Sequence, residues 1–383
     1  MKKLVFLFAM VLVAGFAMAQ TTVIDQTTVG DPNTSIQEAV VSQTGSSLVK
    51  ITQLTEKAGP AEFNHKAEVK QSGGNDNTII VKQVATGNIS GTGTNTTYAE
   101  QKGKKNSLKQ TQISGNWTSG GMKFTSKQVG ESNVAEQFSK KTNGVFSISQ
   151  DGKQNEAYQK TTGEKTGNLI ADIKQVGNKN IATQLFHGQD VRNAGAEILQ
   201  TADGNEAKQE FDLGSQGAFY GPGTNSSKAF IKQTDNNNYA YQKQVGQGSY
   251  QEIIQSGVSN EASMWSYGNY NMAYAIQKGS NAMLKVTQKQ DEKGIALEGE
   301  LSKGNSVMIS QDGNGSEANI LQDGWSNSVE GLGGAGTFAI NNNGAYLKVT
   351  QTGTDNVVQS KQLIGSETVT QVGMNNTAIV SQF

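Results

Sequence analysis

Residues 369–383 read VTQVGMNNTAIVSQF, and the predicted fold depends on the pattern in this stretch. The stretch fills every position of the unit Gln-x-Gly-x-x-Asn-x-(Ala/Val/Leu)-x-x-x-Gln, with Gln371, Gly373, Asn376, Ala378 and Gln382. Two other places fill the unit completely, namely Gln101/Gly103/Asn106/Leu108/Gln112 and Gln351/Gly353/Asn356/Val358/Gln362. A recurring unit of this kind is typical of repeat proteins, in which each structural unit stacks on its neighbours.

Partial copies of the unit extend the array over most of the chain. They lie at Gln128/Gly130/Asn133, Gln150/Gly152/Asn155, Gln175/Gly177/Asn180, Gln255/Gly257/Asn260 and Gln322/Gly324/Asn327. Between Gln128 and Gln288 the anchor glutamines are mostly 22 to 25 residues apart, with a wider gap from Gln200 to Gln233. One coil of two short strands fits this period. We expect loop insertions where the pattern is interrupted, near residues 86–97, 211–228, 289–304 and 331–346.

Aliphatic residues recur two positions before the anchor glutamines. They include Ile148, Ile173, Ile231, Ile253, Val286, Ile309, Ile320, Val349 and Val369. Because residues i and i+2 share one face of a strand, this spacing places the aliphatic side chains and the glutamines on the same face. The opposite rows mix Lys, Glu, Thr, Ser and Tyr. The alternation predicts an all-β fold, a β-solenoid of stacked strand-turn-strand repeats with one face inward and one in water.

The Gly-x-x-Asn segments are predicted to be the turns between the two strands of a coil. A reversal this tight requires positive φ, which Gly and then Asn adopt most readily. The predicted turn glycines are Gly103, Gly130, Gly152, Gly177, Gly257, Gly313, Gly324, Gly353 and Gly373.

The inward amides are predicted to form ladders along the stack. At a coil spacing of about 4.8 Å each amide lies above its equivalent, so its N–H can donate to the amide carbonyl of the neighbouring coil. This bonding satisfies groups that are costly to bury unpaired. The predicted ladder residues are Gln101, Asn106, Gln112, Gln128, Asn133, Gln150, Asn155, Gln175, Asn180, Gln233, Asn238, Gln244, Gln255, Asn260, Gln277, Gln288, Gln311, Gln322, Asn327, Gln351, Asn356 and Gln362.

The C-terminal repeat is a candidate polymerisation face. The open end of a solenoid exposes strand N–H and C=O groups that can pair with another strand. The repeat runs to Phe383 without a divergent cap, and we expect Gln371, Asn376 and Gln382 to face the next molecule. A head-to-tail contact of this kind does not close, so it would grow a filament of the chain with itself.

Composition excludes several classes of protein. Only 34% of the 383 residues are hydrophobic, whereas the chain has 37 Gln and 34 Asn, so a thick apolar core is not expected. The net charge is −1 and Arg192 is the single arginine, which argues against nucleic acid as a partner. Cys is absent, and the pattern implies no cofactor. His65 and His187 lie in no ligand-spaced cluster, so we expect both at the surface, without a metal or catalytic role.

The N-terminus has the features of a secretory signal peptide. Lys2 and Lys3 precede the apolar stretch Leu4–Phe16, and Ala17-Met18-Ala19 is a small-residue cleavage site. An N-terminal membrane anchor is the alternative, which the short apolar run disfavours, and no other segment could span a bilayer. The expected organisation is a signal peptide at 1–19, an irregular or export-related segment at 20–42, and a solenoid with loop insertions at 43–383.

The repeat resembles that of the curli family, in which each curlin repeat is a strand, a turn and a strand with internal Gln and Asn ladders. The likeness covers about residues 71–383. It implies a structural subunit of an extracellular functional amyloid fibre, in the biofilm matrix or at the surface of a Gram-negative-type bacterium. It also implies a curli-type secretion pore and a nucleator as partners. The chain departs from the family pattern in its length and its insertions.

Two other function classes remain open. One is a monomeric β-solenoid surface adhesin or carbohydrate-binding protein that grips surfaces or polysaccharide. The aromatic residues that could stack on sugar rings are Trp117, Trp265, Trp325, Tyr267, Tyr270 and Tyr274, although aromatic pairing across a sheet is the more ordinary account of them. The other class is a β-helix enzyme, which would need a charged cluster repeated on one outward face. The sequence shows no such cluster, so we do not expect an enzyme.

Overall fold

The computed structural model consists of strands, turns and bends in the part of the chain that it describes. The described residues are 8–12, 21–29, 35–56, 63–86, 93–114, 121–140, 142–162, 165–188, 190–212, 227–246, 248–290, 304–331, 338–340, 343–360 and 365–380. Within these ranges there is no helix, and therefore none long and apolar enough to cross a membrane. The predicted all-β fold is confirmed.

The strands belong to two compact units, which divide between Ala194 and Gly195. Sheet A of unit 1 contains β1 (Phe8–Leu12), β3 (Ser35–Gln43), β5 (Phe63–Ser72), β7 (Gly93–Lys104), β9 (Met122–Glu131), β11 (Thr142–Lys153), β13 (Lys165–Val176) and β15 (Asp190–Arg192). Sheet B of unit 1 contains β2 (Thr21–Val29), β4 (Ser47–Glu56), β6 (Asn77–Thr86), β8 (Ser107–Ser114), β10 (Val134–Lys140), β12 (Glu156–Thr161) and β14 (Ile181–His187).

Unit 2 repeats this two-sheet plan. Its sheet A contains β16 (Gly195–Gln200), β18 (Lys228–Gln233), β20 (Tyr250–Gln255), β22 (Met272–Gln277), β24 (Ser306–Gln311), β26 (Ser328–Gly331), β27 (Phe338–Ile340), β29 (Val357–Ser360) and β31 (Thr377–Val380). Its sheet B contains β17 (Glu206–Asp212), β19 (Tyr239–Val245), β21 (Glu261–Tyr267), β23 (Met283–Lys289), β25 (Glu317–Trp325), β28 (Tyr346–Thr354) and β30 (Ser366–Met374).

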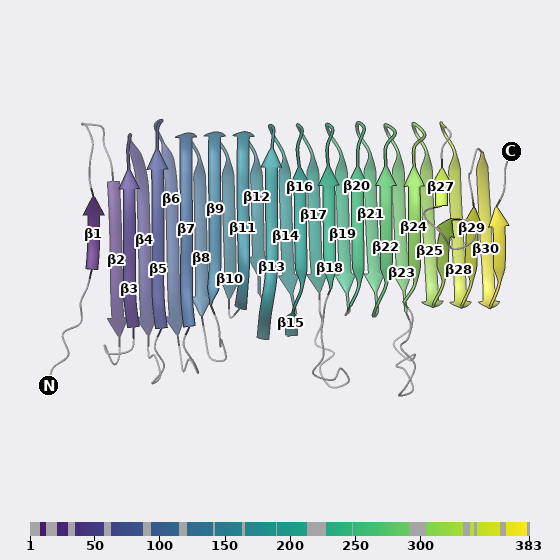
Figure 1. Cartoon of the computed structure of the whole chain (residues 1–383), viewed down its shortest axis with the longest axis horizontal. Coiled ribbons are helices and arrows are strands. Elements are labelled where there is room, and N and C mark those ends of the chain that lie inside the picture. Colours follow the sequence, from purple (N-terminus) through teal and green to yellow (C-terminus); the bar gives the residue numbers. More distant parts are fainter. Residues whose placement is uncertain are drawn as a thin grey trace. The chain divides into compact units, whose positions relative to one another are not determined.

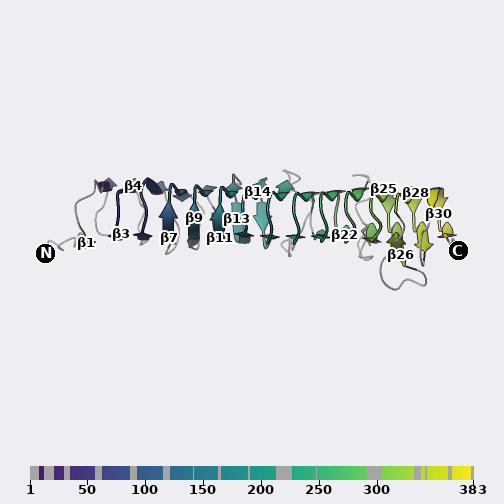
Figure 2. The same cartoon turned by 90° about the horizontal axis from the view of Figure 1, so that it is seen from above.

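Strands of one sheet pair in parallel, coil upon coil. Between β9 and β11, for example, Phe124 pairs with Phe146 and Gln128 with Gln150. Figure 1 shows the strands of each unit side by side, and Figure 2 shows them as two layers. A rung is therefore one strand of sheet A and one of sheet B. Its register is set by identical or similar residues on successive rungs, which is the architecture of a β-solenoid.

The inward faces carry the residues that the alternation predicted. In β9 the inward residues Phe124, Ser126 and Gln128 are fully buried, whereas the outward Lys123 and Lys127 are exposed. The thin core holds many alanines and other small aliphatic residues. Its largest fully buried side chains are phenylalanines. Aromatic rings fit because they contact one another between successive rungs, as Phe124 and Phe146 do edge to face with their centroids 5.1 Å apart.

The turns differ from the prediction at one position. Gly130 has φ +113°, as expected, but the second residue with positive φ is Ser132 (+58°) and not Asn133. Asn133 is fully buried, because it has turned inward to join a ladder. The same residue before the Asn has positive φ in the other Gly-x-x-Asn turns. Of the predicted turn glycines, Gly313 alone lacks a positive φ, and its turn uses Gly315 (+65°) instead.

A half-coil of 11 residues explains why Gly turns occur at both edges of unit 2. Gln255 in β20, Ser266 in β21, Gln277 in β22 and Gln288 in β23 follow one another at this spacing and alternate between the two sheets. All four are buried. The two strands of a coil are therefore built on one pattern, and 22 residues complete a rung.

The stack begins before residue 43, the expected start of the solenoid. The strand β2 pairs with β4, and β3 pairs with β5, so residues 21–29 and 35–43 belong to the two sheets. Their register places Gln26 beside Gln53 and Gln43 beside Gln71. We call β2 and β3 the first rung. The expectation of an irregular segment arose because no Gly follows Gln26 at the turn position.

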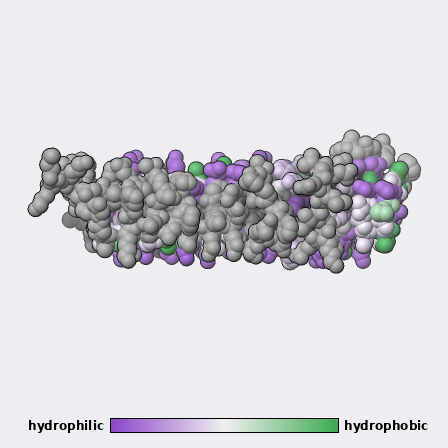
Figure 3. All heavy atoms as spheres, turned by 90° about the horizontal axis from the view of Figure 1, so that it is seen from below, coloured by the Kyte–Doolittle hydropathy of each residue, from purple (hydrophilic) through white to green (hydrophobic). Residues whose placement is uncertain are grey.

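The last rung consists of β30 and β31. Within the described residues, β30 pairs only with β28 and β31 only with β29, so one edge of each strand has no neighbouring strand. At the end of unit 2 that carries this rung, hydrophobic side chains lie at the surface among hydrophilic ones (Figure 3).

The close stacking of the turns gives a test of the fold. A Cβ added at Gly130 would lie 1.9 Å from the Gly152 carbonyl oxygen, whereas one at Gly73 (φ +71°) would have no atom within 4 Å. We expect Gly130→Ala to lower the free energy of unfolding by about 2–5 kcal/mol, from backbone strain and overpacking together. Gly73→Ala should cost only about 1–2 kcal/mol, from strain alone. Urea denaturation of both variants measures the difference, and equal losses would show that the turns do not stack in this way.

Candidate functional site

Buried glutamines form a continuous ladder through sheet A of unit 1. The Nε2 of Gln101 donates to Oε1 of Gln128 (2.6 Å), Gln128 donates to Gln150 (2.8 Å), and Gln150 donates to Gln175 (2.9 Å). Each amide also donates to a backbone carbonyl of sheet B, as Gln128 does to Ser107 (3.1 Å). Both hydrogens of such an amide are therefore bonded, which offsets the cost of burying it.

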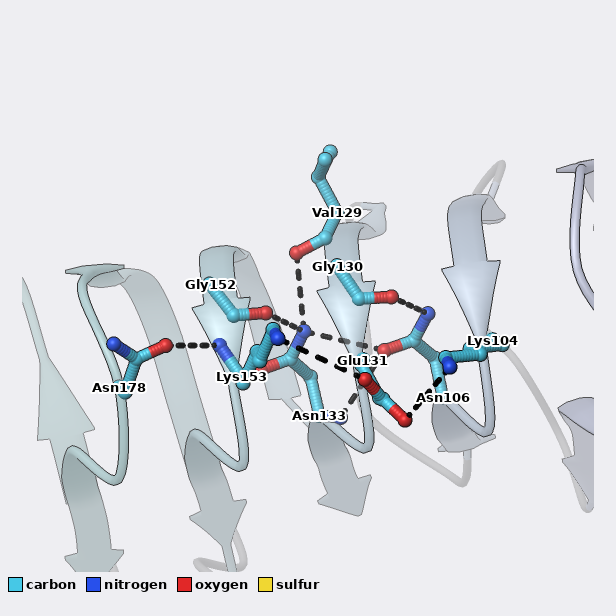
Figure 4. Close-up of polar contacts among 9 residues, drawn as sticks. All are labelled: Lys104, Asn106, Val129, Gly130, Glu131, Asn133, Gly152, Lys153 and Asn178. Atoms are coloured by element: carbon cyan, nitrogen blue, oxygen red, sulfur yellow. Dashed lines mark hydrogen bonds and ion pairs between the residues drawn. The ribbon is translucent and has the colours of Figure 1, made fainter.

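Buried asparagines form a second ladder at the turns (Figure 4). Oδ1 of Asn106 accepts hydrogen bonds from the backbone N–H and the Nδ2 of Asn133, at 3.1 and 3.2 Å. In the other direction, Nδ2 of Asn106 donates to the carbonyl of Gly130 (3.0 Å) and Nδ2 of Asn133 to that of Gly152 (2.9 Å). The ladder thus ties each turn to the next, and it uses the Gly carbonyl that a Cβ would obstruct.

Charged residues beside the same turns also pair between rungs. The carboxylate of Glu131 forms ion pairs with the Nζ of Lys104 (3.2 Å) and the Nζ of Lys153 (3.9 Å) (Figure 4). Both lysines are exposed, so each ion pair contributes about 0–1 kcal/mol. The buried amides, and not these ion pairs, fix the vertical register.

Unit 2 contains equivalent ladders in each sheet. In sheet A, Gln233 donates to Gln255 and Gln255 donates to Gln277, both at 2.8 Å, and Gln277 donates to Gln311 at 2.9 Å. In sheet B the order is Gln288, Gln322, Gln351 and Gln371, with distances of 3.0, 3.0 and 2.9 Å. The asparagine ladder here includes Asn305, Asn327, Asn356 and Asn376.

The structure buries the ladder residues that it describes. At most 1% of the side chain is exposed at Gln101, Asn106, Gln112, Gln128, Asn133, Gln150, Asn155, Gln175, Asn180, Gln233, Asn238, Gln244, Gln255, Asn260, Gln277, Gln288, Gln311, Gln322, Asn327, Gln351 and Asn356. Gln362 and Gln382 lie outside the described residues. In the last rung Gln371 is 6% exposed and Asn376 is half-buried.

Two ladders consist of glutamines that, apart from Gln112, were not among the predicted site residues. In unit 1 the first contains Gln110, Gln137, Gln159 and Gln184, and the second contains Gln26, Gln53, Gln83 and Gln112. The first could have been found by continuing the period of two along the strand from each Asn. The second has no Gly two residues after its glutamines, and only the aliphatic residues that precede them, such as Val81, indicated it.

The first rung leaves its inner face partly open. Ile24 and Gln26 of β2 are half-exposed, whereas their partners in β4, Ile51 and Gln53, are fully buried. The inner-face side chains of β2 thus lack the cover that each internal rung receives from its neighbour.

The last rung is open in the same way and carries additional apolar side chains. Val372, Met374 and Ile379 are 72%, 70% and 63% exposed. In the preceding rung, Thr352 occupies the position that pairs with Val372, and Gln359 the position that pairs with Ile379. Exposed apolar residues where the internal rung has polar ones indicate a contact surface.

The expectation that His65 lies at the surface was wrong. His65 is 1% exposed on the inner face of β5, and its Nε2 lies 3.1 Å from the Thr55 hydroxyl. Burial lowers the pKa of this imidazole to about 4 from its usual 6.5. His65 is buried because the alternation of β5 places it on the inner face, between Gln37 and Asn95 of the adjacent strands. His187, by contrast, is half-buried and lies 2.9 Å from the Thr162 hydroxyl.

A shallow groove of about 500 Å³ lies on the outward face of β21 and β23. Its lining consists of Trp265, Tyr267, Lys285, Thr287, Lys289 and Gln290. The Trp265 ring packs edge to face against Tyr241, with centroids 6.0 Å apart. This contact is the cross-strand aromatic pairing expected of such residues. Within the described part of the chain, no group of three or more His, Asp and Glu is arranged to hold a metal ion.

A scan against protein-family models gave no match for this chain, and a comparison with curated protein sequences gave none either. The geometry of ladders and end rungs is therefore the basis for a functional proposal.

Replacing one amide within a ladder tests its contribution. Gln150→Leu removes the acceptor of Gln128 and the donor to Gln175, so we expect a loss of about 1–3 kcal/mol in the free energy of unfolding. Lys127→Leu, on the outward face of β9, is the control, and its effect should stay within about 0.5 kcal/mol. If both variants were equally stable in urea denaturation, the ladder would not hold the register.

Buried His65 predicts a specific pH dependence. Its lowered pKa means that the unfolded chain binds a proton between pH 6.5 and about 4 while the folded chain does not. Stability from the neutral ring is therefore fully present above pH 6.5 and is lost as the pH falls toward 4, by about 3 kcal/mol. In His65→Gln this loss should be absent.

His187→Gln is the matched control for this measurement. His187 lies on the outward row of β14, so this substitution removes a histidine but leaves the buried His65 in place. Urea denaturation at several pH values distinguishes the two variants, and parallel curves for His65→Gln and the unsubstituted protein would contradict a buried neutral His65.

Proposed function

We propose that this protein is a secreted structural subunit of an extracellular amyloid-type fibre, assembled by head-to-tail stacking of one chain on the next. The observation that carries the proposal is that the glutamine ladders of sheet B run to the end rungs, which leave amides and apolar side chains uncovered. A third copy can add to a second as the second added to the first, so growth would continue.

Three features support a fibre over a capped solenoid. The strands are parallel and in register, as in cross-β assemblies, and identical amides stack along them. Open sheet edges such as those of β30 and β31 are the edges on which strands add. Soluble solenoid proteins usually cover them with capping repeats, and within the described residues the last rung has no such cover.

The wider biological role is part of the same proposal. The likeness of the repeat to the curlin repeat supports a curli-like fibre of a biofilm matrix or cell surface, exported by way of the signal peptide at residues 1–19. A secretion pore of the curli type and a nucleator would be its partners. The fibre itself would need no cofactor and no catalytic residue.

The proposal predicts spontaneous polymerisation. The mature chain, residues 20–383, should form thioflavin-positive fibres at tens of micromolar concentration, with a meridional reflection at about 4.7–4.8 Å. Removal of residues 351–383 deletes β29, β30, β31 and the C-terminal part of β28, and should strongly slow assembly in electron micrographs and thioflavin kinetics.

A mature chain that stayed monomeric for days under these conditions would contradict the proposal. That outcome would favour the alternative, a monomeric surface adhesin or carbohydrate-binding protein. The groove beside Trp265 would then be the first place to examine for sugar binding, because aromatic and lysine side chains lie together there.

A further inference from the structure

The sheet A strands of the first and last rungs share a short sequence pattern. In β31 the inner and outer residues are Ala378-Ile379-Val380, and in β3 they are Ala39-Val40-Val41. Both segments are followed by Ser-Gln in the sequence. The two strands therefore have the same inward pattern, a small residue followed two positions later by Val. In both strands this face packs against the neighbouring internal rung.

The structure itself shows a strand on the edge of β3. The strand β1 pairs with it in parallel, with Ala9 beside Ala39, Met10 beside Val40 and Val11 beside Val41. This segment, Ala-Met-Val, differs from the Ala-Ile-Val of β31 at one residue. Because β1 lies within the predicted signal peptide, the edge of β3 would be open in the mature chain, and its pairing with β1 indicates that this edge accommodates a strand of similar pattern.

The ladders have a direction, and the two end rungs are complementary in it. In sheet B of unit 1, Gln26 donates its Nε2 hydrogen to Gln53 at 2.6 Å, so the outer side of the first rung presents the Oε1 of Gln26. In sheet B of unit 2, Gln351 donates to Gln371 at 2.9 Å, so the last rung presents the Nε2 of Gln371. A donor end therefore faces an acceptor end when one copy follows another.

The registers of the two sheets agree. Gln53 donates to the carbonyl of Glu38 at 2.8 Å, and Gln371 donates to that of Val357 at 3.0 Å. In both cases the carbonyl belongs to the preceding rung and stands one residue before an inward residue of sheet A. A second copy placed with its Gln26 beside Gln371 thus has its Ala39 beside Ala378.

We propose that β30 and β31 of one molecule pair in parallel with β2 and β3 of a second copy, with Gln371 beside Gln26 and Ala378 beside Ala39. This assignment of the partner surface rests on the proposed fibre function. It makes residues 21–43 the acceptor rung of the fibre, not a loose leader.

The proposed register satisfies the groups that the end rungs leave open. Gln371 donates to Oε1 of Gln26 in the second copy, and the second hydrogen of that Gln26 amide reaches the carbonyl of Thr377. Ile379, 63% exposed in the single chain, comes to lie beside Val40. The register places no two like charges opposite each other, and Asp25 of the second copy lies beside Thr370.

Cysteine cross-linking tests the register, because the chain has no cysteine of its own. The pair Asp25→Cys and Thr370→Cys, introduced together into the mature chain, places both thiols on the outward face. Directly paired residues in adjacent parallel strands lie about 4.8 Å apart, within the Cα separation of about 4.4–6.8 Å that disulfides span. Mild oxidation after assembly should give dimers, trimers and higher multimers on a non-reducing gel.

The matched control shifts one cysteine by two residues. Val23→Cys with Thr370→Cys keeps both thiols outward and exposed, but it separates the Cα atoms by about 8 Å, too far for a disulfide. This variant should lose the multimer series and give only the background of its two single-cysteine variants, Val23→Cys and Thr370→Cys.

The outcomes separate this inference from the proposed function. Fibres that cross-link equally well, or better, through Val23 overturn the register while the fibre remains. Dimers from Thr370→Cys alone, without the multimer series of the pair, overturn the head-to-tail partner in favour of tail-to-tail contact. If none of the variants nor the unsubstituted chain assembles, the fibre function fails and this interface fails with it.

Discussion

The hydrogen bond between equivalent side-chain amides on successive rungs is the constraint on which the rest of the structure depends. Gln128 can be buried only because Gln101 and Gln150 lie directly on either side of it. A shift of one residue would turn the whole row outward and leave the inner face without its partners. Apolar packing alone would tolerate a shift of two residues much better, because the same face stays inward and one small aliphatic residue fits beside another.

This constraint accounts for the constant register of the strands on either side of an insertion. The insertions vary in length, yet the strands on either side of them return to the same register, as with Gln200 and Gln233. Loop closure becomes only slightly more costly as a loop grows, so the ladder can absorb long insertions at the edges of the rungs. The turn glycines have no such freedom, because each lies against the carbonyl of the next turn.

The direction of the ladders gives the stack two different ends. In each unit the amide-to-amide hydrogen bonds between ladder glutamines run from the N-terminal to the C-terminal member, so Gln371 is left with a donor and Gln26 with an acceptor. The asparagines do not share this sense, since Asn133 donates back to Asn106 as well as forward to Gly152. A stack with unlike ends can add copies in one orientation only, which is the property that a polar filament requires.

Much of the molecule could be inferred from the period of two and the spacing of Gln, Gly and Asn. That pattern indicates strands, inward amides and turn glycines such as Gly130, because a side chain's face in a strand follows from its position alone. It could not show that Ser132, and not Asn133, would take the second positive φ, since both residue positions fit a tight turn. Nor could it identify the first rung or the burial of His65, which depend on what the neighbouring rungs place beside them. Local alternation was thus enough for the type of stack, whereas the partner of each residue was decided only when the rungs came together, because the amide-to-amide hydrogen bonds of the ladders join residues 20 or more positions apart.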